Sequence, residues 1–330
     1  MTMPDPRGVR WAVVGTGAIS ESFIADILAA GSIVSAVWGR RAHRARDVAE
    51  RFGIATWTDD LGAVLARPDV DIVYIATPPA VHVSQTLAAL DAGKHVLVEK
   101  PMATAAADVV RIFDRARLRD RFVMEAMWMK FNPLHRDVLA RIAGGAIGTP
   151  RTMRGGFGMP FPAGGSRWSS ELGGSSVLDQ GIYGITLAVW ALGSVVNVSA
   201  AGTVREGVDV TAELTLQHEH GSTSQIACSM LDFVDPSASI SGSRGWIEIQ
   251  AMFWATDRAA VHAGSVEALW ERPEPVEHPR QGNGYVPMIR AVEEALSTGV
   301  LEHADHDREA THAVASVMDD VRALVFGGGE

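Results

Sequence analysis

The chain has 330 residues, enough for two domains of ordinary size, and its 47% hydrophobic and 21% charged residues are typical of a compact globular protein. A formal net charge of −10 at pH 7 would be repelled by a phosphate backbone, which excludes nucleic acid as a partner. Cys228 is the single cysteine, so no internal disulfide can form and a cytoplasmic location is expected. The N-terminal residues predict no signal peptide, and no apolar run reaches the roughly 20 residues of a membrane span.

The first part of the chain alternates short apolar runs with helical stretches. The runs predicted to be buried strands are 9–14, 33–38, 71–76, 95–98 and 122–126. The predicted helices are 18–30, 41–52, 81–92 and a last one that has Thr104 as its N-cap and ends near Leu118. Strands separated by helices predict a parallel sheet with helices on both faces. Such sheets bind ligands beyond the carboxyl ends of their strands, so the loops after the strands are the informative ones.

The loop after the first strand fits a dinucleotide-binding turn. Its sequence, Gly15-Thr16-Gly17-Ala18-Ile19-Ser20, matches G-x-G-x-x-(small) between a strand and a helix. The first glycine permits a tight turn, the second allows a pyrophosphate to approach the backbone, and the helix start offers free N–H groups to the phosphates. The residues predicted to bind the pyrophosphate are Gly15, Gly17, Ala18, Ile19 and Ser20. An ordinary glycine turn is the simpler alternative.

The end of the second strand bears on the choice of nicotinamide cofactor. An NAD-binding protein usually has an acidic residue there, which accepts hydrogen bonds from the ribose 2′-hydroxyl. This chain instead has Gly39-Arg40-Arg41, and no acidic residue follows until Asp47. An arginine can bind a 2′-phosphate with its planar fork of donors, so NADP is predicted and NAD remains possible. Solvated charges at a helix start are the alternative explanation.

Two later loops carry residues suited to a cofactor or to chemistry. The predicted cofactor-lining residues there are Thr77, Pro78, Pro79, His82, Glu99 and Lys100. In Glu99-Lys100-Pro101, charged residues end a strand predicted to be buried, where charges are rare without partners. Lys100 could hydrogen-bond a substrate oxygen and stabilise the negative charge that develops on it. A structural turn at 77–79 and a structural Glu99–Lys100 pair explain these residues equally well.

From residue 149 onward the pattern changes to strands of alternating character separated by turns. The predicted strands are 195–204, 210–218, 224–231, 238–241 and 246–249. They leave no room for helices between them, which predicts an antiparallel sheet with one face free to pack on something else. A helix is predicted before them at 177–192, where Asp179 and Tyr183 lie four residues apart and can approach the same point. A phenol beside a carboxylate is a workable proton donor or acceptor for a carbinol oxygen. On the residues alone, a structural pair is the simpler explanation.

Taken together, these motifs resemble the Gfo/Idh/MocA family of oxidoreductases over nearly the whole chain. The matching segments are Glu99-Lys100-Pro101 and Gly173-Gly174-Ser175-Ser176-Val177-Leu178-Asp179-Gln180-Gly181-Ile182-Tyr183. Further segments are similar to the dimeric trans-dihydrodiol dehydrogenase and D-xylose dehydrogenase branch: 124–128, 131–133, 239–245 and 317–322. The chain departs from that branch in the glycine-rich segment 155–165 and at Gln180 and Gly184.

The resemblance implies an α/β protein in two domains. Residues 1–127 are expected to form a Rossmann domain with a doubly wound parallel sheet. Residues 128–330 are expected to form an α+β domain with an open, mostly antiparallel sheet through which a homo-oligomer forms. The resemblance also implies Lys100 as the catalytic lysine, Tyr183 as the general acid/base and Asp179 beside them. The residues implied to wall the substrate pocket are Trp128, Phe157 and Trp254.

The predicted function is therefore NADP-dependent hydride transfer to or from a carbinol or carbonyl carbon of a sugar or trans-diol. A non-catalytic NADP-binding sensor or scaffold is the alternative; it would need the Gly15–Ser20 loop but has no use for Lys100, Asp179 and Tyr183 together. A metal-dependent enzyme is disfavoured, because neither His218-Glu219-His220 nor the pair His303 and His306 offers a convincing ligand set. No metal and no membrane partner are expected.

Overall fold

The computed structural model describes residues 8–264, 266–267 and 272–328, and they fall into two compact units. The first unit comprises Met1–Phe131 and Arg280–Thr311, and the second comprises Asn132–Pro279 and His312–Glu330. The sequence-based division at residue 127 differs from this one, because it assigned residues 280–311 to the second domain. The N-terminal residues on which the signal-peptide prediction rests lie largely outside the described part of the chain.

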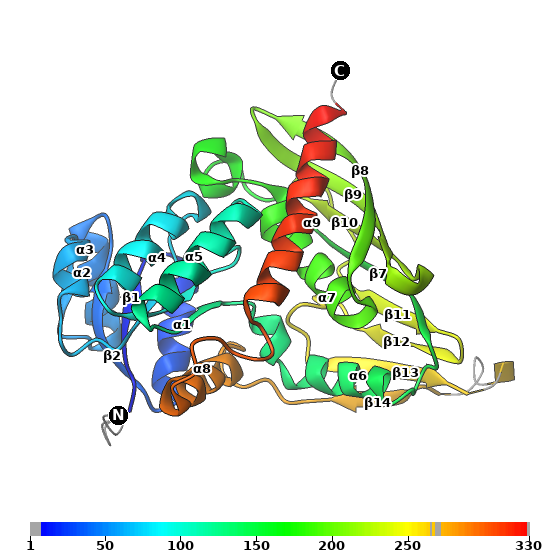
Figure 1. Cartoon of the computed structure of the whole chain (residues 1–330), viewed down its shortest axis with the longest axis horizontal. Helices are drawn as coiled ribbons and strands as arrows, with labels where there is room; N and C mark the ends of the chain where they lie inside the picture. The colour runs from blue at the N-terminus through cyan, green and yellow to red at the C-terminus, as the bar shows by residue number, and fades with distance from the viewer. Residues whose placement is uncertain (1–7, 265, 268–271, 329–330) are drawn as a thin grey trace. The chain divides into compact units, whose positions relative to one another are not determined.

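The first unit is built on a six-stranded parallel sheet (Figure 1). Its strands are β1 (Arg10–Val14), β2 (Ile33–Trp38), β3 (Trp57–Thr58), β4 (Ile72–Ile75), β5 (His95–Val98) and β6 (Val123–Glu125). Their order in the sheet is β3-β2-β1-β4-β5-β6, and every neighbouring pair is parallel. This is the doubly wound order in which the strand sequence reverses between β1 and β4, so the predicted Rossmann sheet is confirmed. The sequence missed only the two-residue edge strand β3.

Helices accompany the strands as the alternation predicts. They are α1 (Ala18–Ala29), α2 (Ala42–Phe52), α3 (Leu61–Leu65), α4 (His82–Asp91), α5 (Ala106–Arg119) and α8 (Val286–Thr298), with short 3₁₀ turns at Pro79–Val81 and Trp128–Phe131. The predicted N-cap of α5 was wrong: the cap position is Ala105, whose side chain cannot accept a hydrogen bond, and not Thr104. The helix therefore begins two residues after the threonine.

Residues 280–311 join the first unit through buried polar contacts that no local pattern reveals. Asp26 of α1 is 1% exposed, and its carboxylate accepts hydrogen bonds from the backbone N–H groups of Asn283 (2.8 Å) and Tyr285 (2.8 Å). The carboxylate of Glu293 in α8 accepts one from the Trp11 indole at 2.9 Å. Helix α8 also packs against α1. Because these partners are more than 250 residues apart, single-sequence reading could not pair them.

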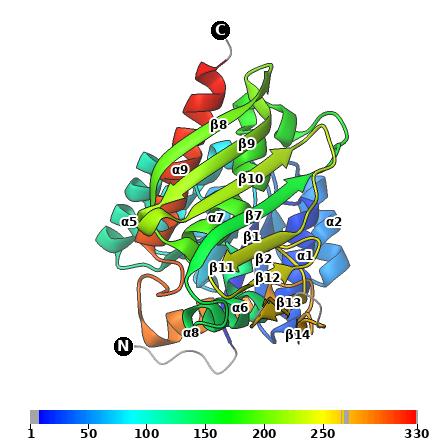
Figure 2. The same ribbon diagram turned by 90° about the vertical axis from the view of Figure 1, so that its right-hand side faces the viewer.

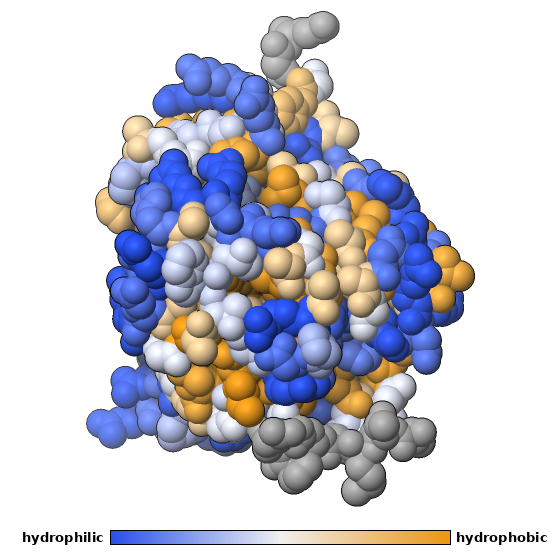
Figure 3. Space-filling model, turned by 90° about the vertical axis from the view of Figure 1, so that its left-hand side faces the viewer, coloured by the Kyte–Doolittle hydropathy of each residue, from blue (hydrophilic) through white to orange (hydrophobic). Residues whose placement is uncertain are grey.

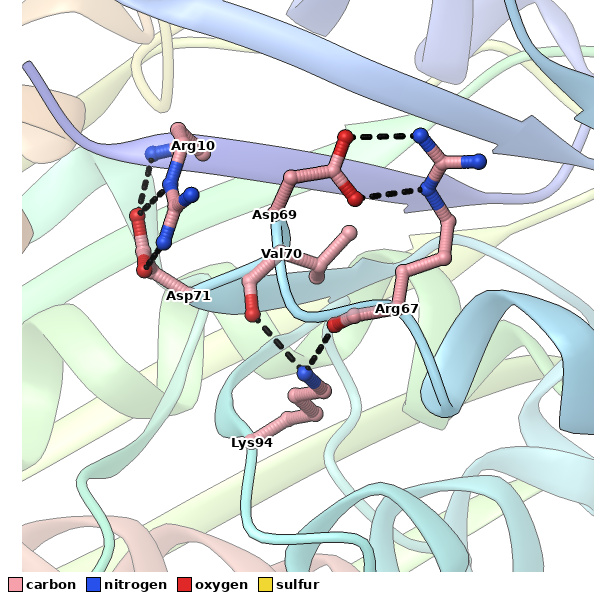
Figure 4. A network of polar contacts seen from close by, with 6 residues as sticks. All are labelled: Arg10, Arg67, Asp69, Val70, Asp71 and Lys94. Carbon is pink, nitrogen blue, oxygen red and sulfur yellow. Dashed lines mark hydrogen bonds and ion pairs between the residues drawn. The ribbon is translucent and has the colours of Figure 1, made fainter. Parts of the chain in front are cut away.

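A charged network lies at the amino ends of β1, β4 and β5 (Figure 4). Arg10 donates to both oxygens of Asp71, at 2.9 and 2.6 Å. Lys94 is 8% exposed and donates to the backbone oxygens of Arg67 (2.6 Å) and Val70 (2.9 Å), while burial lowers its pKa. These charges stand at the edge of the sheet opposite the carboxyl ends where such sheets bind ligands, so we interpret the network as structural.

The second unit is built on an eight-stranded sheet (Figure 2). Its strands are β7 (Pro150–Gly158), β8 (Val195–Arg205), β9 (Val208–His218), β10 (Thr223–Ser229), β11 (Ala238–Gly242), β12 (Gly245–Ile249), β13 (Arg258–Ala263) and β14 (Glu274–Glu277). The order is β14-β13-β12-β11-β7-β10-β9-β8, and all pairs are antiparallel except β7 with β10. The remaining helices are α6 (Pro133–Ala143), α7 (Ile182–Leu192) and α9 (Arg308–Gly327). The predicted mostly antiparallel sheet is confirmed.

Strand β7 was missed because its glycines weaken the strand pattern. The structure gives the reason for two of them. A Cβ atom on Gly156 would lie 2.5 Å from a methyl carbon of Val234, and one on Gly158 would meet the same side chain at 2.5 Å. The segment around Val234 therefore crosses directly over β7, and only glycines allow so close an approach.

The surface seen in Figure 3 mixes hydrophilic and apolar residues. Single exposed apolar side chains are common on folded proteins, so Trp57 and Leu118, which are exposed in the first unit, do not indicate a partner. Among the described residues, no helix combines the length and apolar character that crossing a membrane requires.

Candidate active site

The two glycines of the turn after β1, Gly15 and Gly17, have different surroundings. Gly15 has a φ of 134°, and a Cβ atom there would lie only 2.4 Å from the backbone oxygen of Ala76 at the end of β4. Gly17 is different, because its φ of −84° suits any residue and a Cβ atom would meet no protein atom within 4 Å. Protein packing thus explains the first glycine but not the second. Open space over Gly17 is what a pyrophosphate needs in order to reach the backbone.

Helix α1 presents an uncapped start beside this space. Gly17 is its N-cap, and no side chain caps the first turn. The first N–H groups of a helix have no partner within the helix and carry a partial positive charge. Ala18 and Ile19 are exposed there, whereas Ser20 is buried against Gly15. These features fit the phosphates of a dinucleotide.

The end of β2 lies next to the same turn. A Cβ atom on Gly39 would come within 2.6 Å of the Thr16 side chain, so Gly39 lets the two loops touch. Arg40 and Arg41 follow and are both exposed. Within the described part of the chain, neither guanidinium makes an ion pair or a side-chain hydrogen bond. Both are therefore available to an anionic group bound at this edge of the sheet.

His82 ties together the loops that follow β4 and β5. Its side chain is 1% exposed, with Nε2 lying 2.7 Å from the backbone oxygen of Thr77 and Nδ1 2.8 Å from that of Pro101. A neutral imidazole has only one N–H, so only the protonated ring could donate to both carbonyl oxygens. Burial lowers the pKa of His82, although its contacts with the two carbonyl oxygens act in the opposite direction. The Thr77 hydroxyl donates to Gln85 at 2.6 Å. That His82 and 77–79 line the cofactor stays a prediction.

Lys100 follows β5 at the carboxyl edge of the parallel sheet, the edge that also carries the Gly15–Gly17 turn. Glu99 beside it is 7% exposed. One carboxylate oxygen of Glu99 accepts a hydrogen bond from the Tyr74 hydroxyl at 2.5 Å, and the other accepts one from the backbone N–H of Lys100 at 3.1 Å. Burial raises the pKa of Glu99 to about 7. Glu99 thus fixes the backbone of Lys100, whose side chain is partly exposed.

The raised pKa of Glu99 predicts a pH-dependent stability. A carboxyl group that binds its proton more tightly in the folded protein stabilises the fold fully below its unfolded pKa of 4.5 and loses that contribution as pH rises through about 7. At about 1.4 kcal/mol per pKa unit, the loss is on the order of 3 kcal/mol. Urea unfolding of wild type and Glu99→Gln at pH 5 to 8 should show the wild type losing stability relative to the variant. Parallel stability curves would contradict the assignment.

In the second unit, Asp179 and Tyr183 stand on either side of a change in helix type. The predicted single helix 177–192 begins as a π-helical turn, Val177–Gly181, and continues as α7 from Ile182. Asp179 lies inside the π turn, and Tyr183 lies in the first turn of α7 and is 5% exposed. Single π turns are rare and occur frequently at functional sites.

Two of the three predicted pocket residues gather around Tyr183. The rings of Phe157 and Trp254 are stacked with centroids 3.6 Å apart, and the Tyr183 ring lies 6.0 Å from Trp254 and 6.2 Å from Phe157. Flat apolar faces of this kind suit the C–H surfaces of a sugar or ring diol. Trp128 belongs to the first unit, where it is 7% exposed and packs against Tyr285 with ring centroids 5.0 Å apart. Its role in substrate binding stays a prediction.

Arg167 is a site residue that the sequence did not identify. Its guanidinium Nε lies 2.5 Å from a carboxylate oxygen of Asp179, and it is stacked 4.4 Å over the Phe161 ring. Phe161 lies in the glycine-rich segment 155–165, in which the chain departs from the family branch, and Arg167 follows two residues after it. The arginine gives the Asp179 carboxylate an ionic partner and fixes its direction. A lone arginine in a loop carries no sequence signal of this role.

The departures at Gln180 and Gly184, on either side of Tyr183, also have structural reasons. The Gln180 side-chain amide is buried and donates to the backbone oxygen of Ser229 in β10 at 2.9 Å. A Cβ atom on Gly184 would lie 2.7 Å from the Ile226 side chain, so glycine allows α7 to press onto β10. These contacts hold the helix against the sheet.

No group of three or more His, Cys, Asp or Glu side chains suited to a metal ion occurs within the described residues. His218 Nδ1 lies 2.8 Å from the Gly193 oxygen and its Nε2 lies 2.9 Å from the Ser224 hydroxyl. His306 pairs with the buried carboxylate of Glu125 at 2.9 Å. Both histidines are thus engaged in structural contacts.

The 3-2-1-4-5-6 sheet and its glycine turn define a dinucleotide-binding protein of the Rossmann class. Comparison with known families agrees: residues 9–127 match the model described as the oxidoreductase family with an NAD-binding Rossmann fold, and residues 135–248 match the GFO/IDH/MocA C-terminal domain. The chain belongs to the Gfo/Idh/MocA family of oxidoreductases, and its enzymatic class is that of the nicotinamide-dependent dehydrogenases and reductases.

Individual relatives include two named enzymes. The chain is 30% identical over 329 residues to trans-1,2-dihydrobenzene-1,2-diol dehydrogenase of Mus musculus, covering 96% of this chain and 97% of that protein. It is 32% identical to dTDP-3,4-didehydro-2,6-dideoxy-alpha-D-glucose 3-reductase of Actinomadura kijaniata, covering 95% of each. A solved structure of a 3-ketoreductase from that organism, in complex with NADP and TDP-benzene, has a TM-score of 0.85 at 30% identity and covers 96% of this chain and 98% of that one. An aldose-aldose oxidoreductase from Caulobacter crescentus shares the fold, with a TM-score of 0.87 at 23% identity over 98% of each chain.

Proposed function

We propose that this protein is an NADP-dependent dehydrogenase or reductase acting on a carbinol or carbonyl carbon of a sugar or trans-diol. The observation that carries the proposal is Lys100, which stands at the same carboxyl edge of the parallel sheet as the open space over Gly17. The aromatic walls around Tyr183 and the names of the dihydrodiol and keto-sugar relatives support the substrate class.

In the proposed mechanism, the bound nicotinamide supplies or accepts the hydride. Tyr183 exchanges a proton with the substrate oxygen as general acid/base. Lys100 donates a hydrogen bond to that oxygen and stabilises the negative charge that develops on it. Asp179, held by Arg167, orients the proton-transfer pair. Phe157 and Trp254 pack against the apolar face of the substrate and position the reacting carbon.

The preference for NADP is proposed from the arginines after β2. Replacing Arg40 with serine should raise the Kd for NADPH about 10–100-fold, because a charge-assisted hydrogen bond is worth about 1.5–3 kcal/mol. The Kd for NADH, which lacks the 2′-phosphate, should change little. Fluorescence titration of both cofactors measures the two constants. An equal loss for NADPH and NADH would show that Arg40 does not read the phosphate.

We also infer a homo-oligomer and, from the single cysteine, a cytoplasmic location. The open face of the second unit's sheet carries a depression of about 850 Å³. The residues that line it include Arg154, Ser199, Glu213, Thr215, Gln225 and Ser239. A second copy of this face could cover it, as the family resemblance implies. Light scattering that gave the mass of a single chain at micromolar concentration would contradict the oligomer.

The enzymatic proposal is tested by turnover with a substrate panel. Aldoses, keto-sugars and trans-diols are each mixed with the protein and with NADP⁺ or NADPH, and absorbance at 340 nm is followed. We expect turnover with at least one member, and faster turnover with the phosphorylated cofactor than with NAD⁺ or NADH. Tight NADPH binding without any absorbance change across the panel would favour a non-catalytic sensor or scaffold instead.

A further inference from the structure

One buried carboxylate in the second unit is placed for a task that the proposed mechanism does not yet include. Asp209, at the start of β9, is 0% exposed. A buried carboxylate is costly unless hydrogen bonds compensate it. Here three donors converge on its Oδ2 atom: the Ser175 hydroxyl at 2.9 Å, the Ser176 hydroxyl at 3.1 Å and the Val177 backbone N–H at 2.9 Å. Its Oδ1 atom lies 3.7 Å from Nε of Arg322 in α9.

All three donors belong to the start of the π turn that carries Asp179. Val177 is the first residue of that turn, and Ser176 at the cap position makes no capping hydrogen bond with its own side chain. Asp209 in strand β9, 32 residues after Val177, therefore caps the start of the turn. A negative charge at this end of a helix also interacts favourably with the helix dipole. The Ser175 hydroxyl completes the cap by accepting a hydrogen bond from the Leu178 N–H at 3.0 Å.

The far end of the same turn is held as well. The Gln180 side chain donates a hydrogen bond to the backbone oxygen of Ser229 in β10. Gly181 lies close to the Cys228 sulfur, because a Cβ atom added at Gly181 would be 3.4 Å from it. Anchors at both ends preserve an extra residue that an ordinary α-helix would not contain. If the first anchor were lost and the turn relaxed to α-helix, the residues before α7 would rotate by about 100° relative to Tyr183. Asp179 would then move away from Tyr183.

We propose that Asp209 is a positioning residue for the reaction: it pins the π turn and thereby sets where Asp179 stands relative to Tyr183. The inference rests on the proposed function. Asp209 acts through its hydrogen bonds to residues 175–177 and not through contact with substrate or cofactor. The sequence analysis did not identify Asp209, although an acidic residue between Val208 and Val210 at the start of a buried strand is unusual.

The test compares Asp209→Asn with a control on the same strand. The asparagine keeps the size but removes the charge that draws three donors to one oxygen. We expect kcat to fall about 10–100-fold and its pH profile to shift by about 0.5–1 unit, with the Kd for NADPH unchanged because the cofactor residues lie in the first unit. Leu216→Ala, which truncates a fully buried side chain elsewhere on β9, should lower stability but leave kcat and its pH profile unchanged below the melting temperature. The same loss of kcat in both variants would overturn the proposal, as would normal kcat in Asp209→Asn.

Two further measurements keep the proposal falsifiable if Asp209→Asn does not fold or if no substrate is found. Ser175→Ala removes two of the cap's hydrogen bonds while leaving the carboxylate in place, and it should lower kcat about 3–10-fold. Amide hydrogen exchange of either folded variant should accelerate at residues 177–183 and remain unchanged in β10. This readout requires no turnover, so a wild type without activity would refute the proposed function while the exchange pattern still decides the role of Asp209. Unaltered exchange at 177–183 in the folded variants would overturn it.

Discussion

Lys100→Met and Tyr183→Phe are each expected to lower kcat about 10²–10⁴-fold, the usual cost of removing a well-placed acid/base or a charge-stabilising donor. Methionine keeps most of the volume of the lysine but has no ammonium to donate to a developing oxyanion. Phenylalanine keeps the packing of the Tyr183 ring against Trp254 and Phe157 and removes only the hydroxyl. The Kd for NADPH should stay within about threefold of wild type, since neither change touches the glycine turn or the arginines after β2.

The matched control for the lysine is Lys94→Met. Lys94 is a buried lysine of the same unit, but it donates to backbone oxygens at the opposite edge of the sheet (Figure 4). Leaving those oxygens without a donor should cost about 1–3 kcal/mol of stability, with little change in kcat at 25 °C. If Lys100→Met or Tyr183→Phe retained full turnover, the assignment of that residue would be wrong. If Lys94→Met lost as much turnover as Lys100→Met, the effect at Lys100 would be one of stability and not of catalysis.

Gly17→Val is expected to weaken NADPH binding at least ~100-fold, equivalent to about 2.7 kcal/mol, with the free energy of unfolding nearly unchanged. The structure separates these two effects. A Cβ atom on Gly17 meets no protein atom within 4 Å and the backbone there is extended, so the fold tolerates a side chain. The same side chain would occupy the space that a pyrophosphate must enter to reach the start of α1. Isothermal titration with NADPH and urea unfolding of the same sample measure both quantities.

Gly15→Ala provides the contrast. A Cβ atom there would lie 2.4 Å from the Ala76 oxygen in a φ region that disfavours side chains, so this variant should lose stability even without cofactor. Unimpaired NADPH binding by Gly17→Val would show that the dinucleotide does not approach this turn. A large loss of stability in that variant would contradict the structural reading of the open space.

The parallel sheet of the first unit was predictable because its signals are local. Apolar runs mark β1, β2, β4, β5 and β6, with glycine directly after β1 and β2 and proline shortly after β4 and β5, and helical stretches of adequate length separate them. The features that the sequence did not predict also have physical reasons. Thr104 looked like a cap, but α5 begins two residues later. Residues 280–311 join the first unit through Asp26 and Glu293, and partners so distant in sequence leave no local trace.

The sequence predicted the types of residue in the candidate site, but not the contacts that hold them in place. The segments Glu99-Lys100-Pro101 and 173–183 identified Lys100 and Tyr183 through a family resemblance, and their roles stay predictions. The π turn was not predicted because its residues satisfy an α-helical pattern, and the hydrogen bonds at its two ends come from β9 and β10, which are distant in sequence. Arg167 was overlooked for a similar reason, since an arginine in a glycine-rich loop reveals nothing of the carboxylate it meets.

We propose above that Lys100 and Tyr183 act on the same substrate oxygen beside the nicotinamide. A crystal structure of the protein with NADP⁺ and a substrate found in the turnover panel tests this most directly. We expect the Lys100 Nζ and Tyr183 Oη atoms both to lie about 2.6–3.2 Å from the reacting oxygen, with the pyrophosphate over Gly17. A complex in which either atom lies beyond reach of that oxygen, even through one bridging water, would contradict it.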